Sequence, residues 1–156
     1  MNILDQLKRP FPVERVHWRV GATNRDKTSA IALAYIDARD VMKRLDDVAG
    51  FDKWQCRYPI SDSGLLICEI GLFLNDQWVW KANGAGDTQV EAEKGKCSDA
   101  FKRAAVLWGI GQYLYMLPNK WVPLVNKKLD SIPPMPQWAI PEVYDEIIAK
   151  RNENGK

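Results

Sequence analysis

The sequence contains few of the residues that most catalytic and metal-binding sites need. It has one histidine, His17, and three cysteines, none of which forms a CxxC pair. The ligand spacing of a zinc site is therefore missing, and we expect neither a metal nor another cofactor. We predict Cys56, Cys68 and Cys97 in strands or on a buried helix face, where a free thiol packs as a small apolar group. His17 is expected in a strand as a surface or packing residue, so a Cys–His nucleophile pair is not expected.

A nucleotide-binding phosphate loop is also missing. The run Gly95-Lys96-Cys97-Ser98 ends like such a loop, but Val90 stands where the first glycine is needed, and Cys97 replaces the serine or threonine after the lysine. No apolar run approaches the length of a membrane span, and the N-terminus lacks a signal peptide's continuous apolar stretch. The odd number of cysteines suits a reducing cytoplasm. We therefore expect an ATP-independent, non-enzymatic protein that does not insert into a membrane.

What the sequence does have is a periodic pattern of apolar residues typical of an α+β fold. The predicted elements are a helix at 3–8, a hairpin of strands at 16–22 and 28–35, a helix at 37–48, a meander of strands at 53–60, 65–74 and 77–82, and a long helix at 88–108. We predict helices packed on an antiparallel sheet. Residues 1–120 are assigned to one core domain. Residues 121–156 are assigned to a proline-rich, mostly extended tail with a short helix at 141–150 and a disordered end.

The long helix carries the most informative pattern. Its apolar residues fall within one arc, and its charged residues fall on the far side. The apolar arc comprises Val90, Cys97, Ala100, Phe101, Ala104, Leu107 and Trp108. The polar side comprises Lys96, Asp99, Lys102 and Arg103. Thr88 and Glu91 form a capping box at the start. Asp99 is expected to pair with Arg103 four residues later or to cap an assembly contact.

The basic residues at element edges are candidates for a polyanion-binding surface. Lys102 and Arg103 could neutralise adjacent phosphates, and Arg25 and Lys27 at the hairpin tip could close over the same strand. A net charge of +2 permits such a partner without identifying it. An ordinary solvated surface is the alternative for these residues. Trp78, Trp80 and Trp108 are expected in the core rather than as base-stacking platforms.

Two stretches of the chain resemble the Rad-fifty-two-type single-strand annealing proteins, and most closely the small versions of phages and prophages: VHWRVGATNRDKTSAIALAYIDARDVMKRLDDVAGFDKWQ and EAEKGKCSDAFKRAAVLWGIGQYLY. The resemblance covers roughly residues 16–117. It implies assembly into an oligomeric ring or arc, with single-stranded DNA in a groove between the core and the projecting hairpin. The site residues that it implies are Lys102 and Arg103 at the groove floor, Arg39 and Tyr35 at the tyrosine-led start of the helix at 37–48, and Arg19, Arg25 and Lys27 on the hairpin. Lys96, on the polar side of the long helix, is a further candidate for binding single-stranded DNA.

The function that the resemblance implies is ATP-independent annealing of complementary single strands in homologous recombination and DNA repair. The expected partners are single-stranded DNA and further copies of the chain, with a host single-strand-binding protein or a phage exonuclease as additional candidates. The expected location is the cytoplasm of a bacterial host. Lys53 and Arg57 are weak candidates for a second, outer DNA site. Two other classes stay open: a non-annealing single-strand protector, and a structural or partner-recruiting module.

Overall fold

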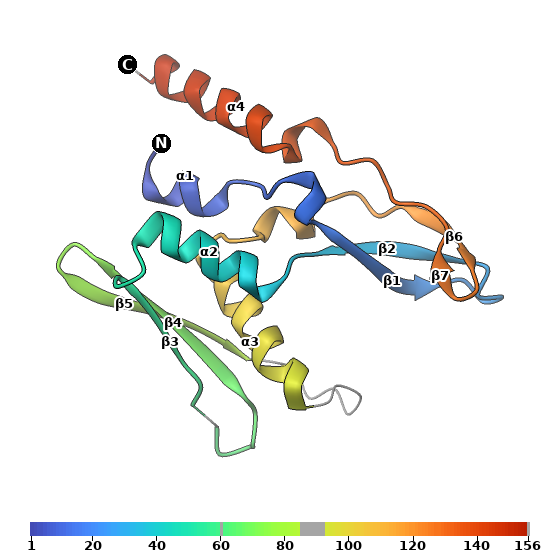
Figure 1. Ribbon diagram of the computed structural model, residues 1–156, viewed down its shortest axis with the longest axis horizontal. Coiled ribbons are helices and arrows are strands. Elements are labelled where there is room, and N and C mark those ends of the chain that lie inside the picture. Colours follow the sequence, from blue (N-terminus) through green and yellow to red (C-terminus); the bar gives the residue numbers. More distant parts are fainter. Residues whose placement is uncertain (60, 85–92, 156) are drawn as a thin grey trace. The chain divides into compact units, whose positions relative to one another are not determined.

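The computed structural model describes residues 1–59, 61–84 and 93–155, which form two compact units (Figure 1). Unit 1 comprises Met1–Lys8 and Ala38–Gln112, and unit 2 comprises Arg9–Asp37 and Tyr113–Lys156. Each unit combines helices with an antiparallel sheet. The predicted α+β class is therefore confirmed.

The sheet of unit 1 is the predicted meander. It consists of β3 (Trp54–Arg57), β4 (Ile67–Leu74) and β5 (Gln77–Gly84), paired antiparallel in that order. Asn75 and Asp76, with φ angles of 51° and 63°, form the two-residue turn between β4 and β5. Both residue types tolerate the left-handed conformation that such a hairpin turn requires. This turn sets the register in which Phe73 lies opposite Trp78.

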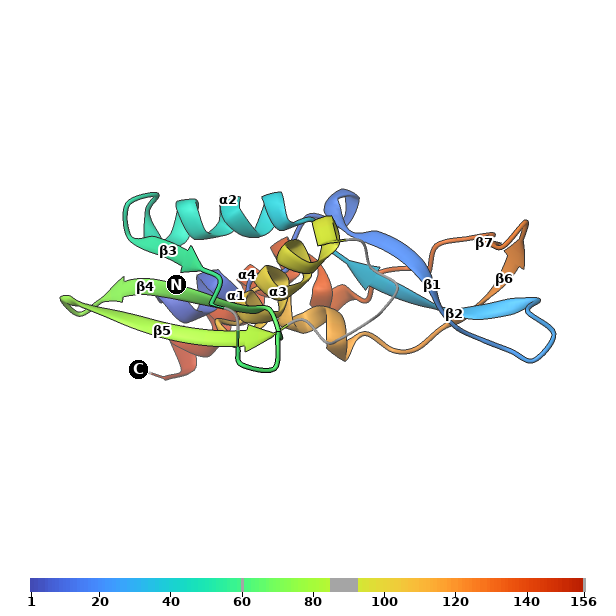
Figure 2. The same cartoon turned by 90° about the horizontal axis from the view of Figure 1, so that it is seen from below.

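The described residues of unit 1 also form the helices α1 (Ile3–Lys8), α2 (Ala38–Ala49) and α3 (Glu93–Leu107). Helix α3 packs on β4 and β5, and α2 packs beside β3 (Figure 2). Phe101 of α3 is buried with Ile70 and Leu72 of β4, and its ring lies 6.2 Å from the ring of Trp54. The indole N–H of Trp108 donates a buried hydrogen bond of 3.1 Å to the carbonyl of Ile70. The core of unit 1 therefore lies between the meander and α3. The predicted capping box of Thr88 and Glu91 lies outside the described residues.

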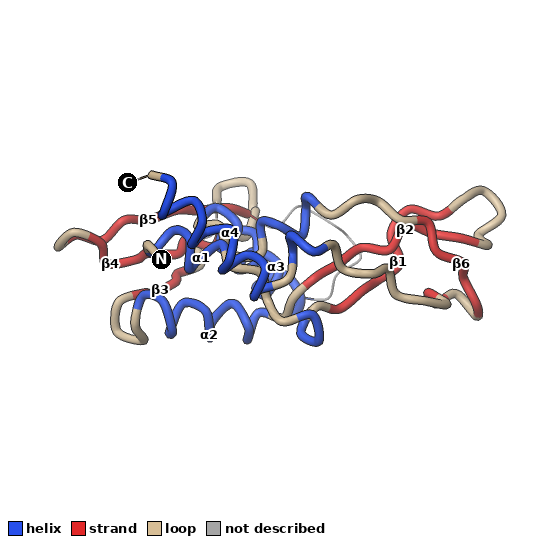
Figure 3. The backbone as a smooth tube through the Cα atoms, turned by 90° about the horizontal axis from the view of Figure 1, so that it is seen from above, coloured by secondary structure: helices blue, strands red, loops and turns tan. Residues whose placement is uncertain are grey.

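Unit 2 is built on a four-stranded sheet with the order β1-β2-β6-β7 (Figure 3). Strands β1 (His17–Thr23) and β2 (Ser29–Tyr35) are the predicted hairpin. Strands β6 (Trp121–Val125) and β7 (Lys128–Leu129) come from the segment that was predicted to be an extended tail. Strand β6 pairs with β2, so these residues belong to the same sheet as the hairpin.

Among its described residues, unit 2 also contains the helix α4 (Pro141–Asn154). Short 3₁₀ helices lie at η1 (Val13–Arg15), η2 (Gln112–Met116, whose first residue belongs to unit 1) and η3 (Gln137–Ala139). Helix α4 begins at Pro141 as predicted, because proline fits the first turn of a helix. It continues past the predicted end into residues that were expected to be disordered, and that expectation was wrong. Arg9 donates two hydrogen bonds, of 2.8 Å and 2.9 Å, to the carboxylate of Asp145 on α4.

Several predicted burial states were wrong. Cys68 is buried, and burial raises the pKa of its thiol to about 12, but Cys56 and Cys97 are exposed. Trp108 lies in the core as predicted, whereas the side chain of Trp78 is 38% exposed. The periodic pattern assigns residues to a face of an element but does not say how far the packing partner extends along it.

In the part of the chain that the structure describes, no helix combines the length and hydropathy needed to cross a membrane.

Candidate functional site

The polar side of α3 carries the basic pair that the sequence predicted. Arg103 is exposed and Lys102 is half-buried, while Phe101 and Ala104 on the other side are buried. Arg103 donates a hydrogen bond from Nε to Oδ2 of Asp99 over 3.1 Å. The predicted pairing of Asp99 with Arg103 is therefore confirmed. Because packing fixes the apolar side of α3, the basic side is presented on a rigid element.

Two further predicted residues belong to unit 1. Lys96 is half-buried in the first turn of α3, and Arg39 is exposed at the start of α2. Helices α2 and α3 pack against each other. Unit 1 thus holds four of the predicted cations on two contacting helices.

Unit 2 contains an open groove of about 460 Å³ between β1 and the β6–β7 hairpin. Its lining combines aromatic, aliphatic and cationic side chains: Val16, His17, Trp18, Arg19, Val20, Tyr35, Lys127, Lys128, Leu129 and Ile132. Arg19 and Tyr35 are the two predicted site residues among them. None of the described residues that line this groove is acidic, so its charged groups would all attract an anion.

The turn between β6 and β7 brings two lysines to the groove. Asn126 and Lys127 adopt the left-handed conformation, with φ angles of 52° and 62°, and the chain reverses at once into Lys128. The sequence analysis missed Lys127 and Lys128. The available signal was Asn126 directly after the apolar run at 121–125, because asparagine is typical of the left-handed positions of a hairpin turn. Pro123 counted against a strand there, because proline cannot donate a ladder hydrogen bond.

The aromatic wall of the groove is held by contacts within unit 2. The ring of His17 lies 5.3 Å from the ring of Tyr35, centroid to centroid. Nε2 of His17 lies 3.1 Å from Oδ2 of Asp37, so the imidazole is anchored on its other side as well. Aromatic rings beside cations form the combination that binds single-stranded nucleic acids, because bases stack on the rings and phosphates accept hydrogen bonds from the cations.

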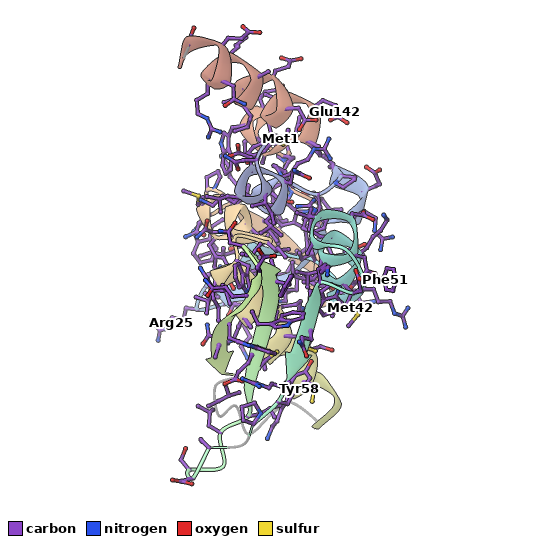
Figure 4. All side chains as sticks on the ribbon, turned by 90° about the vertical axis from the view of Figure 1, so that its left-hand side faces the viewer. Met1, Arg25, Met42, Phe51, Tyr58 and Glu142 are labelled. Atoms are coloured by element: carbon purple, nitrogen blue, oxygen red, sulfur yellow. The ribbon has the colours of Figure 1, made fainter. Side chains whose placement is uncertain are left out.

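The tip of the β1–β2 hairpin presents Arg25 and Lys27, both exposed, and Arg25 is labelled in Figure 4. The side chain of Asn24 shapes this tip. Its Oδ1 accepts hydrogen bonds from the backbone N–H groups of Thr28, at 2.8 Å, and Ser29, at 3.1 Å. The tip is therefore a defined turn rather than a loose loop, with its two cations in water.

The structure thus sorts the predicted site residues into two sets. Lys96, Lys102, Arg103 and Arg39 belong to unit 1. Arg19, Arg25, Lys27 and Tyr35 belong to unit 2. Within residues 1–59, 61–84 and 93–155, no group of three or more His, Cys, Asp or Glu side chains is placed to hold a metal ion.

Comparison with known proteins places this arrangement in a family. Residues 1–62 and 67–131 match the model of the Rad52/22 family double-strand break repair protein. The chain is 34% identical over 151 residues to the single-stranded DNA-binding protein DdrA of Deinococcus deserti, covering 90% of the chain and 71% of that protein. It is 34% identical over 145 residues to DdrA of Deinococcus radiodurans, covering 90% and 69%. The predicted family is therefore confirmed: the chain belongs to the Rad52/22 family of double-strand break repair proteins.

Proposed function

We propose that the protein binds single-stranded DNA and anneals complementary strands in DNA repair and recombination, without ATP and without a catalytic site. Family membership and two relatives named as single-stranded DNA-binding proteins support this proposal. The single structural observation that carries it is the groove of unit 2, whose lining includes the contacting rings of His17 and Tyr35 together with Arg19, Lys127 and Lys128.

The basic pair of α3 supplies the grip on the DNA backbone in this proposal. Lys102 and Arg103 neutralise neighbouring phosphates, with Arg39 and Lys96 as further contacts. Phosphate contacts carry no base information, so binding tolerates any sequence. A strand held by its backbone keeps its base edges available to a complementary strand. Pairing then supplies the driving force, since stacking in duplex DNA contributes about 1.4 kcal/mol per base-pair step.

The groove of unit 2 supplies the base contacts. The rings of Tyr35 and the neighbouring His17 offer faces for stacking, and each stacked base contributes about 1–3 kcal/mol in comparable sites. Arg19 and the two lysines of the β6–β7 hairpin neutralise the flanking phosphates. Arg25 and Lys27 at the hairpin tip extend the positive surface.

The finer parts of the proposal concern assembly, partners and setting. We infer that several copies assemble into a ring or arc along one strand, because a chain of this size contacts only a short piece of DNA. A host single-strand-binding protein or a phage exonuclease is a candidate further partner. A phage or prophage version of the family, acting in the bacterial cytoplasm, is the setting that we infer.

The test is annealing of two complementary labelled oligonucleotides without ATP across a protein titration. We expect acceleration near the protein concentration that coats the strands. The variant Lys102→Ala/Arg103→Ala should bind DNA more weakly. Loss of two phosphate contacts should also lower the slope of log affinity against log salt by about 1.4, at roughly 0.7 per contact for single strands.

The matched control is the double variant Lys150→Ala/Arg151→Ala. It removes the same charge from two consecutive residues near the end of another helix, α4. Equal losses in both double variants would refute the assignment of the α3 pair. Tight binding without acceleration would support the second candidate, a protector of single strands, which also agrees with the two relatives being single-stranded DNA-binding proteins. Absence of binding would refute both.

A further inference from the structure

The three cysteines of the chain have no part in the proposed function, and all three belong to unit 1. Cys56 lies on β3, Cys68 on β4, and Cys97 near the start of α3. Cys56 and Cys97 are exposed, whereas Cys68 is buried. Three elements that are separate along the chain thus each contribute one thiol to the same unit.

The alternation of side chains along β3 directs Cys56 to the side of the meander that α3 covers. The ring of Trp54 lies 6.2 Å from the ring of Phe101 on α3, so Trp54 marks this side. Side chains two residues apart on a strand point the same way, which places Cys56 on the side of Trp54. Cys56 pairs with Ile70 on β4, and Ile70 and Cys68 are both completely buried. Cys68 is therefore the diagonal neighbour of Cys56 on the side of α3.

Helix α3 brings the third thiol to the same side. Cys97 precedes Phe101 by about one helical turn, so both side chains lie on one face of the helix. Burial is the main cause that raises the pKa of Cys68, and the nearby thiols of Cys56 and Cys97 raise it further. The three sulfur atoms are therefore close enough to influence one another.

Tyr58, which is labelled in Figure 4, stands between the three thiols. It follows Cys56 by two residues, and its hydroxyl lies within hydrogen-bonding reach of the thiols of Cys56 and Cys68. Burial raises the pKa of Tyr58 above its usual value, and all three thiols, when ionised, raise it further. We call these four residues, Cys56, Tyr58, Cys68 and Cys97, the thiol cluster.

Two members of the thiol cluster are available to a dissolved oxidant. The thiolate, rather than the thiol, is the form of cysteine that attacks. Burial raises the pKa of Cys68 to about 12, so this thiol keeps its proton and has no contact with solvent. Cys56 and Cys97 are open to water. Clustered thiols can also bind a metal ion, but among the described residues no three ligand side chains are placed to hold one.

We propose that Cys56 and Cys97 form a reversible dithiol site that is oxidised by hydrogen peroxide. One thiolate attacks the O–O bond of the peroxide, so its sulfur is oxidised to a sulfenic acid and hydroxide leaves. The second thiolate attacks that sulfur, the S–S bond forms, the S–O bond breaks, and a second hydroxide leaves. The two thiol protons neutralise the two hydroxides. Two thiols and one peroxide thus give one disulfide and two molecules of water.

The disulfide would connect β3 to α3 across a loop of about 40 residues. A cross-link of this kind restricts the unfolded chain and so stabilises the folded unit. It would also hold the turn of α3 that carries Lys96, a candidate phosphate contact, against the meander. Disulfides in reducing compartments are usually transient and redox-sensing, so the bond would last only while the oxidant is present.

The test treats the reduced full chain with hydrogen peroxide, blocks the remaining thiols, and maps the disulfides by mass spectrometry of a tryptic digest. Trypsin places the three cysteines on separate peptides, residues 54–57, 58–81 and 97–102. We expect peptide 54–57 to be linked to peptide 97–102 within one chain, and dithiothreitol to release the link. The oxidised protein should unfold at a Tm at least about 5 °C above that of the reduced protein.

Cys56→Ser and Cys97→Ser should each lose both the link and the rise in Tm. Cys68→Ala is the control and should keep both. Each variant is compared with its own reduced form, so a lower starting stability does not imitate loss of the link. A link from 54–57 to 58–81, a link between two chains, or the absence of any disulfide in the wild type would overturn the proposal. The readouts need no DNA, so this proposal and the proposed function fail independently.

Discussion

Replacing Asp99 with asparagine tests whether the basic pair of α3 touches phosphate. Oδ2 of Asp99 lies 3.1 Å from Nε of Arg103, so this carboxylate sits beside the proposed backbone contact. A phosphate bound on the open side of the guanidinium would feel its negative charge. Asparagine keeps the shape and the hydrogen-bond acceptor but removes the charge. We therefore expect Asp99→Asn to bind single-stranded DNA more tightly than wild type.

The size of this gain follows from Coulomb's law. At a separation of roughly 6 Å in bulk water, two unit charges repel each other by about 0.7 kcal/mol. Removing that repulsion corresponds to about threefold tighter binding at low salt. At an ionic strength of about 0.15 M the screening length is close to 8 Å, which reduces the gain to less than about twofold. The lost ion pair is exposed, so stability should fall by no more than about 0.5 kcal/mol.

Fluorescence anisotropy of a labelled thymidine oligonucleotide, at low salt and at about 0.15 M, measures the effect. The matched control is Glu146→Gln, which makes the same change of net charge at an exposed position of α4. Tighter binding by Asp99→Asn alone, fading with salt, would support the contact. Equal gains in the two variants at low salt would refute it, because the effect would then come from net charge rather than from the position of Asp99.

Two further predictions concern stability. Gly71→Ala places a Cβ 2.8 Å from the ring of Trp80 and should lower the free energy of unfolding, measured in urea, by about 1–3 kcal/mol. Adding Trp80→Leu to the same chain should recover part of that stability, and purely additive losses in the double variant would contradict the proposed clash. The hydrogen-bonded Arg9 guanidinium lowers the pKa of Asp145, so the ion pair stabilises the fold above the unfolded-state pKa of about 3.9, and this contribution is lost as pH falls through the folded-state pKa. Asp145→Asn should therefore lower Tm at pH 7 by the equivalent of less than about 1 kcal/mol, because the pair is only a little more than a third exposed. The difference from wild type should shrink as the pH falls below about 3.9, and a difference that stays constant as the pH falls would argue against the pair.

Most local elements could be predicted from the sequence because their signals are local. The meander follows from alternating apolar residues and from the turn at Asn75 and Asp76, whose residue types suit a left-handed backbone. The buried side of α3 follows from the spacing of Phe101 and Ala104, which Trp108 continues directly after the helix. The pairing of Asp99 with Arg103 follows from their separation by one helical turn.

Features that depend on distant partners could not be predicted in this way. Strand β6 contains Pro123, which counts against a strand, and its partner β2 lies far away along the chain. The lysines at the β6–β7 turn become candidate binding residues only because that hairpin lies beside β1 and completes the groove. The exposure of Trp78 likewise depends on which face of the meander α3 covers. A strand pattern separates two faces but does not say which of them stays in water.

The division of unit 2 between two chain segments has a consequence for folding during synthesis. The chain leaves unit 2 after Asp37 and returns to it at Tyr113, so β2 emerges from the ribosome long before its partner β6. Closing so long a loop costs entropy, and non-local strand pairing is slow for that reason. Once folded, residues 38–112 hold their own two ends at a fixed separation and thereby shorten the effective loop. We therefore expect the sheet of unit 2 to be completed faster when unit 1 has already folded.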